Sequence, residues 1–414
     1  MAHSEKFKAE KVKKIKVKVI GLGDGGTNIV SDIALKLEKA RFLAANTDSQ
    51  SLAKKGKRVE TLIFGQNLTS GLGTGMDPEL GERAALEARE RIKRALAGSD
   101  LCVFVSTLGG GTGSGAMPVF AKISRNLGNL NYGIFTLPFR FEGKKRMEIA
   151  KASLEKMRSD LEGFSVIENE KIFQIIDKKT SLRNALFEVN KILTQALEGL
   201  LTLIYHPGLI NIDFADIRTI LRSGDGLSYL VRTEALGQNR LGEVIKKALN
   251  FPLYSYGIEK ARGVLFNITG GKDLGLSEVD EISKNIFNLS DRGARIVFGV
   301  SESKERGRIG LTILATGCRS EFSEELFSEK EKALPKKTKV KTKEKKADKT
   351  PDKKKKDAQN KDKKEIKRSA SQIRKNALQL KKEAEKMERE MLERERFWET
   401  PALFRRGRNI EQLE

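Results

Sequence analysis

The segment that decides the fold is GGGTGSG, residues 109–115, in which five of seven residues are glycine. It follows the apolar stretch LCVFVS, residues 101–106, which is typical of a buried strand. Successive backbone N–H groups in such a loop can form a nest for an anion, and the hydroxyls of Thr112 and Ser114 add donors. No lysine follows, so the segment is not a phosphate loop of the G-x-x-x-x-G-K-[ST] type. We therefore predict an anion-binding turn at the end of a strand.

Two further glycine loops lie upstream. GLGDGG, residues 21–26, follows an alternating strand pattern at 15–20 and precedes a helical pattern at 28–37. GLGTG, residues 71–75, precedes a helical pattern at 78–96. Loops that follow successive parallel strands meet at the carboxyl edge of the sheet. A dinucleotide oxidoreductase needs one such loop, whereas three loops fit a polyphosphate held on several sides, so we regard the oxidoreductase as the weaker interpretation.

Strand and helix patterns alternate through most of the chain. Apolar runs at 42–45, 62–64, 101–105 and 134–137 alternate with helical patterns such as 78–96 and 144–161. This order predicts the α/β class, with a mostly parallel sheet covered by helices on both faces. A long helical pattern at 182–205 ends at Pro207 and Gly208, and strand patterns at 263–268, 295–300 and 310–315 predict a second α/β domain.

The composition argues against several classes of protein. No run approaches the ~18 apolar residues that a membrane span needs. Residues 1–14 are charged, so we expect no secretory signal there. The two cysteines, Cys102 and Cys318, leave no disulfide framework or Cys-based zinc site and fit a reducing compartment. The two histidines, His3 and His206, leave no His-rich metal site.

The net charge of +23 is concentrated near the C-terminus. Between Lys330 and Arg368 there are 19 basic and 7 acidic residues, a composition that predicts a disordered, solvated spacer. Nucleic acid or an acidic membrane surface is the alternative partner for this tract, and we favour the spacer. Beyond it, apolar residues recur in steps of four and three between Ile373 and Met391, which predicts one highly charged, solvated helix.

The GGGTGSG loop after a buried strand resembles the signature of the tubulin/FtsZ superfamily, and the rest of the chain is similar to the FtsZ family. The ordered matches are NTDSQ (46–50), GLGTGMDPELG (71–81), PFRFEGKKR (138–146), PGLINIDFAD (207–216), ARGVLFNITGG (261–271) and PALFRR (401–406). The resemblance covers about residues 15–318 and the tail peptide. So many ordered matches carry far less false-positive risk than one motif.

The sequence patterns and the resemblance together predict seven segments in order. They are a basic extension at 1–14, a Rossmann-like GTP-binding domain at 15–181, a central helix at 182–206, an α/β activation domain at 207–318, a Lys-rich disordered linker at 319–370, a charged helix at 371–397 and a partner-binding peptide at 398–414. The charged helix is outside what we expect of the family.

The resemblance also implies a function, that of a cytoplasmic cell-division GTPase. Such a protein forms head-to-tail filaments at the mid-cell ring and hydrolyses GTP to GDP between subunits, with Mg²⁺ bound mainly through the nucleotide. The implied catalytic residues are Asp213 and Asp216, with Asn211 beside them. A carboxylate can orient the attacking water, and phosphoryl transfer asks little more of the protein.

Residues implied to bind GTP or GDP come from all parts of the first domain. They are Gly25, Gly26, Asn28, Asn46, Gly73, Gly109, Gly110, Gly111, Thr112, Gly113, Glu142, Arg146 and Asn190. A membrane-tethering division protein is implied to bind the tail through Pro401, Leu403, Phe404, Arg405 and Arg406, so that contact with the membrane is only indirect.

Three residues depart from the family pattern. Asp24 stands where glycine is usual, and because its carboxylate would repel a phosphate, we expect it to point away or to act through Mg²⁺. Leu186 stands where an aromatic ring usually stacks on the base, with Phe187 next to it, and Leu137 replaces a common lysine. Two alternatives to the division GTPase are a non-hydrolysing or regulatory filament protein of the same fold and a plasmid-partitioning tubulin relative.

Overall fold

The computed structural model describes residues 14–37, 39–177, 179–205, 208–224, 226–318 and 322. The predicted charged helix at 371–397 and the peptide at 398–414 lie outside these residues, as does the predicted linker apart from Phe322. Within the described part of the chain, no helix is both long and apolar enough to span a membrane.

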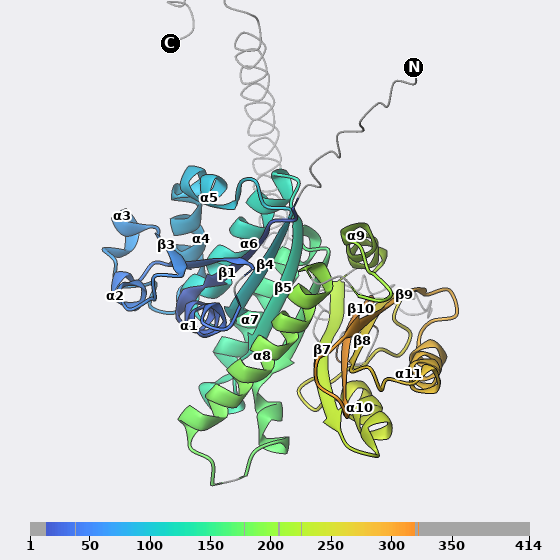
Figure 1. Cartoon of the computed structure of the whole chain (residues 1–414). Coiled ribbons are helices and arrows are strands. Elements are labelled where there is room, and N and C mark those ends of the chain that lie inside the picture. The colour runs from blue at the N-terminus through green and yellow to red at the C-terminus, as the bar shows by residue number, and fades with distance from the viewer. Residues whose placement is uncertain are drawn as a thin grey trace, which may run out of the picture. The chain divides into compact units, whose positions relative to one another are not determined.

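A parallel sheet of six strands forms the first part of the structure (Figure 1). The strands are β1 (Val17–Leu22), β2 (Arg41–Asn46), β3 (Val59–Ile63), β4 (Leu101–Thr107), β5 (Leu130–Leu137) and β6 (Gly163–Glu168), in the spatial order β3-β2-β1-β4-β5-β6. The first, fourth and fifth are buried almost throughout, as expected when helices cover both faces of a parallel sheet. The predicted α/β class is therefore confirmed.

The strand β1 contains a buried lysine. The side chain of Lys18 is 6% exposed, and its ammonium group donates to Glu60 Oε2 at 3.0 Å and to the Ala95 carbonyl at 2.7 Å. The alternating pattern at 15–20 therefore correctly predicts a strand, but the strand begins and ends two residues later. Lys18, the second basic residue of this pattern, is buried and hydrogen-bonded within the protein rather than exposed to solvent.

Eight helices surround these strands in the described part of the chain. They are α1 (Gly23–Ala34), α2 (Ser49–Ala53), α3 (Gln66–Thr69), α4 (Pro78–Glu87), α5 (Arg89–Leu96), α6 (Gly111–Asn126), α7 (Lys144–Met157) and α8 (Leu182–Tyr205). The helix α1 contacts α8, whereas α6 contacts α4, α5 and α7 (Figure 1). The pattern at 78–96 forms two helices instead of one, because the backbone at Ala88 leaves the helical region at φ −88°, ψ 10°.

The second part contains four strands and three helices among the described residues. They are α9 (Phe214–Ser223), β7 (Gly226–Leu236), α10 (Arg240–Leu249), β8 (Gly263–Gly270), α11 (Leu276–Leu289), β9 (Arg295–Glu302) and β10 (Arg308–Thr316). The strands follow the order β7-β10-β8-β9, antiparallel on both sides of β10 and parallel between β8 and β9.

The helix α8 and a strand pairing are among the contacts that join the two parts. The long helix α8 contacts α1 on one side and both β7 and β10 on the other. The strands β6 and β7 pair in parallel at only two positions, Gly163 with Gly226 and Phe164 with Leu227. The ten strands thus form one continuous sheet, and the predicted long helix is present as Leu182–Tyr205.

Candidate functional site

The three glycine loops meet at the carboxyl edge of the parallel sheet. Because β1 pairs with β2 on one side and β4 on the other, the loops after Leu22, Asn46 and Thr107 are neighbours. The glycine loop at 71–75 lies beside the loop after Asn46, because the backbone N–H of Ser49 donates to the Gly71 carbonyl at 3.0 Å. The predicted convergence of the loops is therefore confirmed.

Glycine is required in the first loop by close packing. The helix α1 begins at Gly23, five residues before the predicted start, so Gly25 and Gly26 lie in its first turn. A Cβ on Gly26 would lie 2.5 Å from the Val105 carbonyl oxygen, and one on Gly25 would lie 2.2 Å from Thr107 Oγ1. The first turn of a helix carries N–H groups without intrahelical partners, which suits it to an anion.

In the signature loop, each glycine serves a different purpose. Gly109 has φ 102° and donates its N–H to Ser114 Oγ at 2.8 Å. Cβ atoms on Gly111 and Gly113 would lie 2.2 Å from Thr74 Oγ1 and 2.5 Å from Ser106 Oγ. A Cβ on Gly110 would meet no atom within 4 Å, so this residue borders open space at the start of α6. Two helix N-termini thus lie at the same edge and favour negative charge there.

A cluster of buried hydroxyl groups ties the loops together. Thr112 Oγ1 lies 2.6 Å from Thr47 Oγ1 and 3.2 Å from Thr74 Oγ1, and all three residues are buried. The hydroxyls of Thr112 and Ser114, which the sequence suggests as donors to an anion, therefore both make bonds within the protein. Gly73, next to Thr74 in the chain, adopts φ 85°, a value that favours glycine.

The carboxylate of Asp24 is directed to a neighbouring loop. Its Oδ1 accepts a hydrogen bond from Asn46 Nδ2 at 2.7 Å, and Asn46 Oδ1 accepts one from the backbone N–H of Thr47 at 2.9 Å. Asn46 is 1% exposed, so its amide orientation is fixed by burial. Asp24, which departs from the family pattern, is thus held by Asn46, a residue predicted to bind the nucleotide.

Two charged residues that the sequence analysis does not identify complete this side of the site. Lys55 Nζ donates to Asn28 Oδ1 at 2.5 Å, and Asn190 Nδ2 donates to Asp32 Oδ2 at 3.2 Å. Burial lowers the pKa of Lys55, while the charges of Asp32 and Asp24 act in the opposite direction. No local motif marks Asp32 or Lys55, because their contacts join segments far apart in the sequence.

Glu142 and Arg146 form an ion pair beside the signature loop. Arg146 NH1 lies 2.8 Å from Glu142 Oε2, and Glu142 Oε1 accepts from the Phe139 N–H at 2.9 Å. A Cβ on Gly109 would lie 3.0 Å from the Arg146 carbonyl oxygen, which places the pair next to Gly109. The structure therefore brings this predicted pair to the glycine loops.

On α8, Leu186 shares a face with Asn190. The two residues are four apart, so their side chains lie one above the other on the helix. Phe187 lies three residues before Asn190 and so also neighbours it on the helix surface. Both Leu186 and Phe187 are exposed. Both residues are thus placed to contact a ligand bound near Asn190.

The predicted catalytic acids lie on the second part of the structure. Asp213 is the N-cap of α9, where its Oδ1 accepts from the Asp216 N–H, and Asp216 Oδ2 accepts from the Asp213 N–H. Asn211 Oδ1 accepts from the Gly208 N–H at 3.1 Å. Figure 1 shows α9 well apart from α1 and α2, so the chain does not bring these acids to its own first glycine loop.

Exposed apolar side chains accompany both sets of predicted residues. Leu209, which precedes the acids, is 76% exposed, and Ile210 is 43% exposed. Leu72 and Met76, on the third glycine loop, are 76% and 39% exposed. Large apolar side chains beside polar functional groups are typical of protein–protein contact sites.

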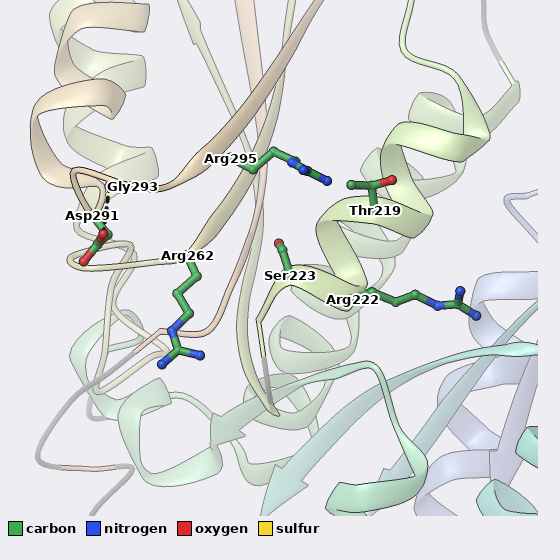
Figure 2. Close-up of a pocket in the computed structure, with 7 residues that line it drawn as sticks. All are labelled: Thr219, Arg222, Ser223, Arg262, Asp291, Gly293 and Arg295. Atoms are coloured by element: carbon green, nitrogen blue, oxygen red, sulfur yellow. Dashed lines mark hydrogen bonds between the residues drawn. The ribbon is translucent and has the colours of Figure 1, made fainter.

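An open hollow of about 660 Å³ lies at the other end of α9. It is lined by Thr219, Arg222, Ser223, Arg262, Asp291, Gly293 and Arg295. Figure 2 shows the Arg222 side chain extending away from Arg262, so the guanidinium groups do not converge on one point. Among the described residues, no group of three or more His, Cys, Asp or Glu side chains could hold a metal ion. The predicted tail residues, Pro401 and 403–406, lie outside the described residues.

Comparisons with known proteins agree with this architecture. Residues 16–177 match the family model of the Tubulin/FtsZ family GTPase domain, and residues 226–319 match that of the FtsZ family C-terminal domain. The structure is similar to that of an empty FtsZ dimer from M. jannaschii, with 36% identity and a TM-score of 0.68 over 74% of this chain and 89% of that one.

Two more distant structures share the fold. A GTPγS-bound protofilament of CetZ2 from Haloferax volcanii has 23% identity and a TM-score of 0.66, covering 77% of this chain and 98% of that one. CetZ from Methanosaeta thermophila has 18% identity and a TM-score of 0.64, covering 91% of this chain and 99% of that one.

Proposed function

Because this chain belongs to the FtsZ family and carries a Tubulin/FtsZ family GTPase domain, we propose that it is a cell-division GTPase whose subunits polymerise head to tail and hydrolyse GTP at the interface between them. One observation carries the proposal. Asp213 and Asp216 follow an exposed apolar segment on a different part of the chain from the glycine loops. A second subunit would bring the acids to the nucleotide and bury those apolar side chains.

The arrangement of the loops supports binding of a nucleoside triphosphate. The N-termini of α1 and α6 offer backbone N–H groups to the phosphates, and Gly110 leaves space for them. Glu142 and Arg146, next to Gly109, would contact the ribose. Asn190 would bind the edge of the guanine, and Leu186 on the same helix face would pack against its plane.

In this proposal, a magnesium ion would be held mainly by the nucleotide. Near the loops, Asp24 already accepts a bond from Asn46, and the described residues contain no cluster of metal ligands. When bound with the nucleotide, Mg²⁺ would neutralise charge on its phosphates. The protein would contribute the positions of the surrounding N–H groups.

Hydrolysis would depend on a carboxylate from the next subunit. In the reciprocal cap, each acid uses one oxygen, Oδ1 of Asp213 and Oδ2 of Asp216. The second oxygen of each carboxylate remains available to accept a hydrogen bond from the attacking water. Because both acids are present, we favour hydrolysis over a non-hydrolysing or regulatory filament protein.

The division role rests on the relatives and on the tail. The 36% identity is to FtsZ, whereas the CetZ structures, below 25%, support the fold alone. The PALFRR peptide at 401–406 would bind a membrane-tethering partner, keeping the filaments in the cytoplasm at the mid-cell ring. This peptide argues against a plasmid-partitioning relative, for which salt-sensitive DNA binding by the tail would be expected.

GTP turnover measured against protein concentration tests the proposal. We expect turnover only above a critical concentration, and loss of turnover in Asp213→Asn, which keeps an N-capping side chain but removes the charge. Asp280→Asn, an equal charge change on the surface of α11, is the matched control and should retain turnover. Turnover proportional to concentration from zero would contradict a site shared between subunits. GTP-dependent sedimentation without turnover would favour the non-hydrolysing filament.

A further inference from the structure

Three charged side chains cluster around the first glycine loop. Asp24 lies in the first turn of α1, Asp32 lies two turns later, and Lys55 comes from the segment that follows α2. Asn28 lies four residues after Asp24 and four before Asp32, so the three side chains share one face of α1, and the Lys55 ammonium group is bonded to Asn28. The cluster therefore carries two negative charges and one positive charge along α1, and Asp24 is the member at the helix N-terminus.

The carboxylate of Asp24, in the first turn of α1, opposes the binding of a polyphosphate there. A unit charge a few ångströms from another contributes on the order of 1 kcal/mol even in water, and more where the protein excludes water. The hydrogen bond from Asn46 orients Asp24, but an amide carries no charge and cannot cancel the repulsion. A cation close to Asp24, in addition to the Mg²⁺ bound with the nucleotide, would offset this repulsion.

Lys55 is positioned to supply that charge. Its side chain is half-buried, and the bond to Asn28 Oδ1 holds the ammonium group against a predicted nucleotide-binding residue. Lys54, one residue earlier, is exposed and provides an internal comparison. The two lysines have the same charge and almost the same sequence position, but only Lys55 is bonded to α1.

We propose that Lys55 is a nucleotide-binding residue of this chain, whose ammonium group offsets Asp24 and allows a nucleoside polyphosphate to occupy the first glycine loop. This inference rests on the proposed function, since it assumes that the loops bind GTP. On binding, the phosphates replace part of the interaction that Lys55 makes with Asn28 in the empty site, and the Asn28 amide becomes available to the ligand.

Titration of the full chain with GTP and with GDP, at low and at moderate salt, tests the proposal. We expect Lys55→Met to raise the Kd for GTP roughly 5- to 10-fold at low salt, the effect of losing one partly screened charge pair. The increase should be smaller for GDP, which carries less charge, and smaller at moderate salt. Lys54→Met should bind like the wild type.

A double-mutant cycle shows whether Lys55 acts by offsetting Asp24. Asp24→Asn should bind GTP at least as tightly as the wild type, and adding Lys55→Met to it should weaken binding less than Lys55→Met does alone. Lys55→Arg should retain most of the affinity, and thermal unfolding without nucleotide should be alike for all variants. Equal effects of Lys55→Met in both backgrounds, or equal binding by Lys55→Met and Lys54→Met, would overturn the proposal. A folded wild type that binds no GTP would overturn the proposed function as well.

Discussion

Asp213 and Asp216 cap the same helix turn reciprocally. The carboxylate of each accepts the backbone N–H of the other, at 2.8 Å for Asp213 Oδ1 and 3.0 Å for Asp216 Oδ2. This capping box satisfies two N–H groups that the start of α9 would otherwise leave without partners. The two acids proposed for hydrolysis therefore also hold the segment that carries them, and variants at these positions have a structural effect as well as a chemical one.

The two effects at Asp216 should separate between alanine and asparagine. Asp216→Ala should lower the free energy of unfolding by about 1 kcal/mol, because the Asp213 N–H loses its acceptor. Asp216→Asn keeps an acceptor oxygen and should unfold nearly like the wild type. Both should lower GTP turnover about 100-fold or more, the usual contribution of a positioned acid or base. Urea unfolding and phosphate release check this, and an active Asp216→Asn would contradict the catalytic role.

Leu209 should contribute to assembly without affecting nucleotide binding. We expect Leu209→Glu to raise the critical concentration for GTP-dependent sedimentation about 10-fold or more, since burying a leucine is worth about 2 kcal/mol. The Kd for GTP should not change, because the residue is distant from the loops. Leu236→Glu, at another exposed leucine at the end of β7, serves as the control. Similar critical concentrations for both variants would exclude Leu209 from the contact.

Alanine should have opposite effects at two glycines. Gly26→Ala should destabilise the fold by about 2 kcal/mol, because the new Cβ would lie 2.5 Å from the backbone oxygen of Val105. Gly110→Ala should leave stability unchanged or slightly higher, since its φ of −91° suits alanine and its Cβ meets open space. It should nevertheless weaken GTP binding by filling that space. Unfolding without nucleotide and GTP titration measure the two effects, and unchanged affinity in Gly110→Ala would place the phosphates elsewhere.

The hydroxyl cluster predicts a stability difference between two substitutions of Thr112. Thr112→Val removes the partner of Thr47 and Thr74 and should cost about 1–3 kcal/mol, the price of leaving buried hydroxyl groups without hydrogen bonds. Thr112→Ser keeps the hydroxyl and should cost less. Chemical denaturation of the nucleotide-free chain distinguishes them. Equal stability of the two variants would show that the hydroxyl cluster does not stabilise the loops.

Cys318 makes stability depend on pH in the alkaline range. Burial raises the pKa of its thiol from 9.0 to about 12 in the folded chain. The folded state therefore favours the protonated thiol, so this contribution to stability is complete below pH 9 and is lost as the pH rises towards 12. Cys318→Ala should reduce the fall in stability over that range. At pH 8, thiol alkylation should be slow in the native chain and fast in urea, and rapid native labelling at this position would contradict the burial.

The strands were predictable where apolar residues form continuous runs. The patterns around Phe42, Phe104 and Phe266 locate β2, β4 and β8 because strands buried on both faces, or at the centre of a sheet, need apolar residues throughout. The strands β6 and β7 were missed. In β7, Arg232 and Glu234 interrupt the apolar pattern, and pairing with the distant β10 determines the strand instead.

The start of α1 shows why element boundaries were harder to predict. Glycine is a poor helix former, so the propensities place the start at Asn28, after the glycine loop. In the structure the helix begins at Gly23, because packing of its first turn against β4 outweighs that preference. The glycine, Glu142 and Arg146 positions were predictable from motifs, whereas Lys55 and Asp32 were not. Their role depends on contacts between segments far apart in the sequence, and no local pattern records those contacts.

The buried ammonium group of Lys18 also specifies how the sheet assembles. A shift of β1 by one residue against its neighbours would turn every side chain to the opposite face. Lys18 would then lose Glu60 and the Ala95 carbonyl, and an ammonium group buried without partners costs several kcal/mol. A strand made only of valine and isoleucine would tolerate this one-residue shift more easily. One charge in an apolar strand thus specifies the strand register during folding, and that register brings the glycine loops to a common edge.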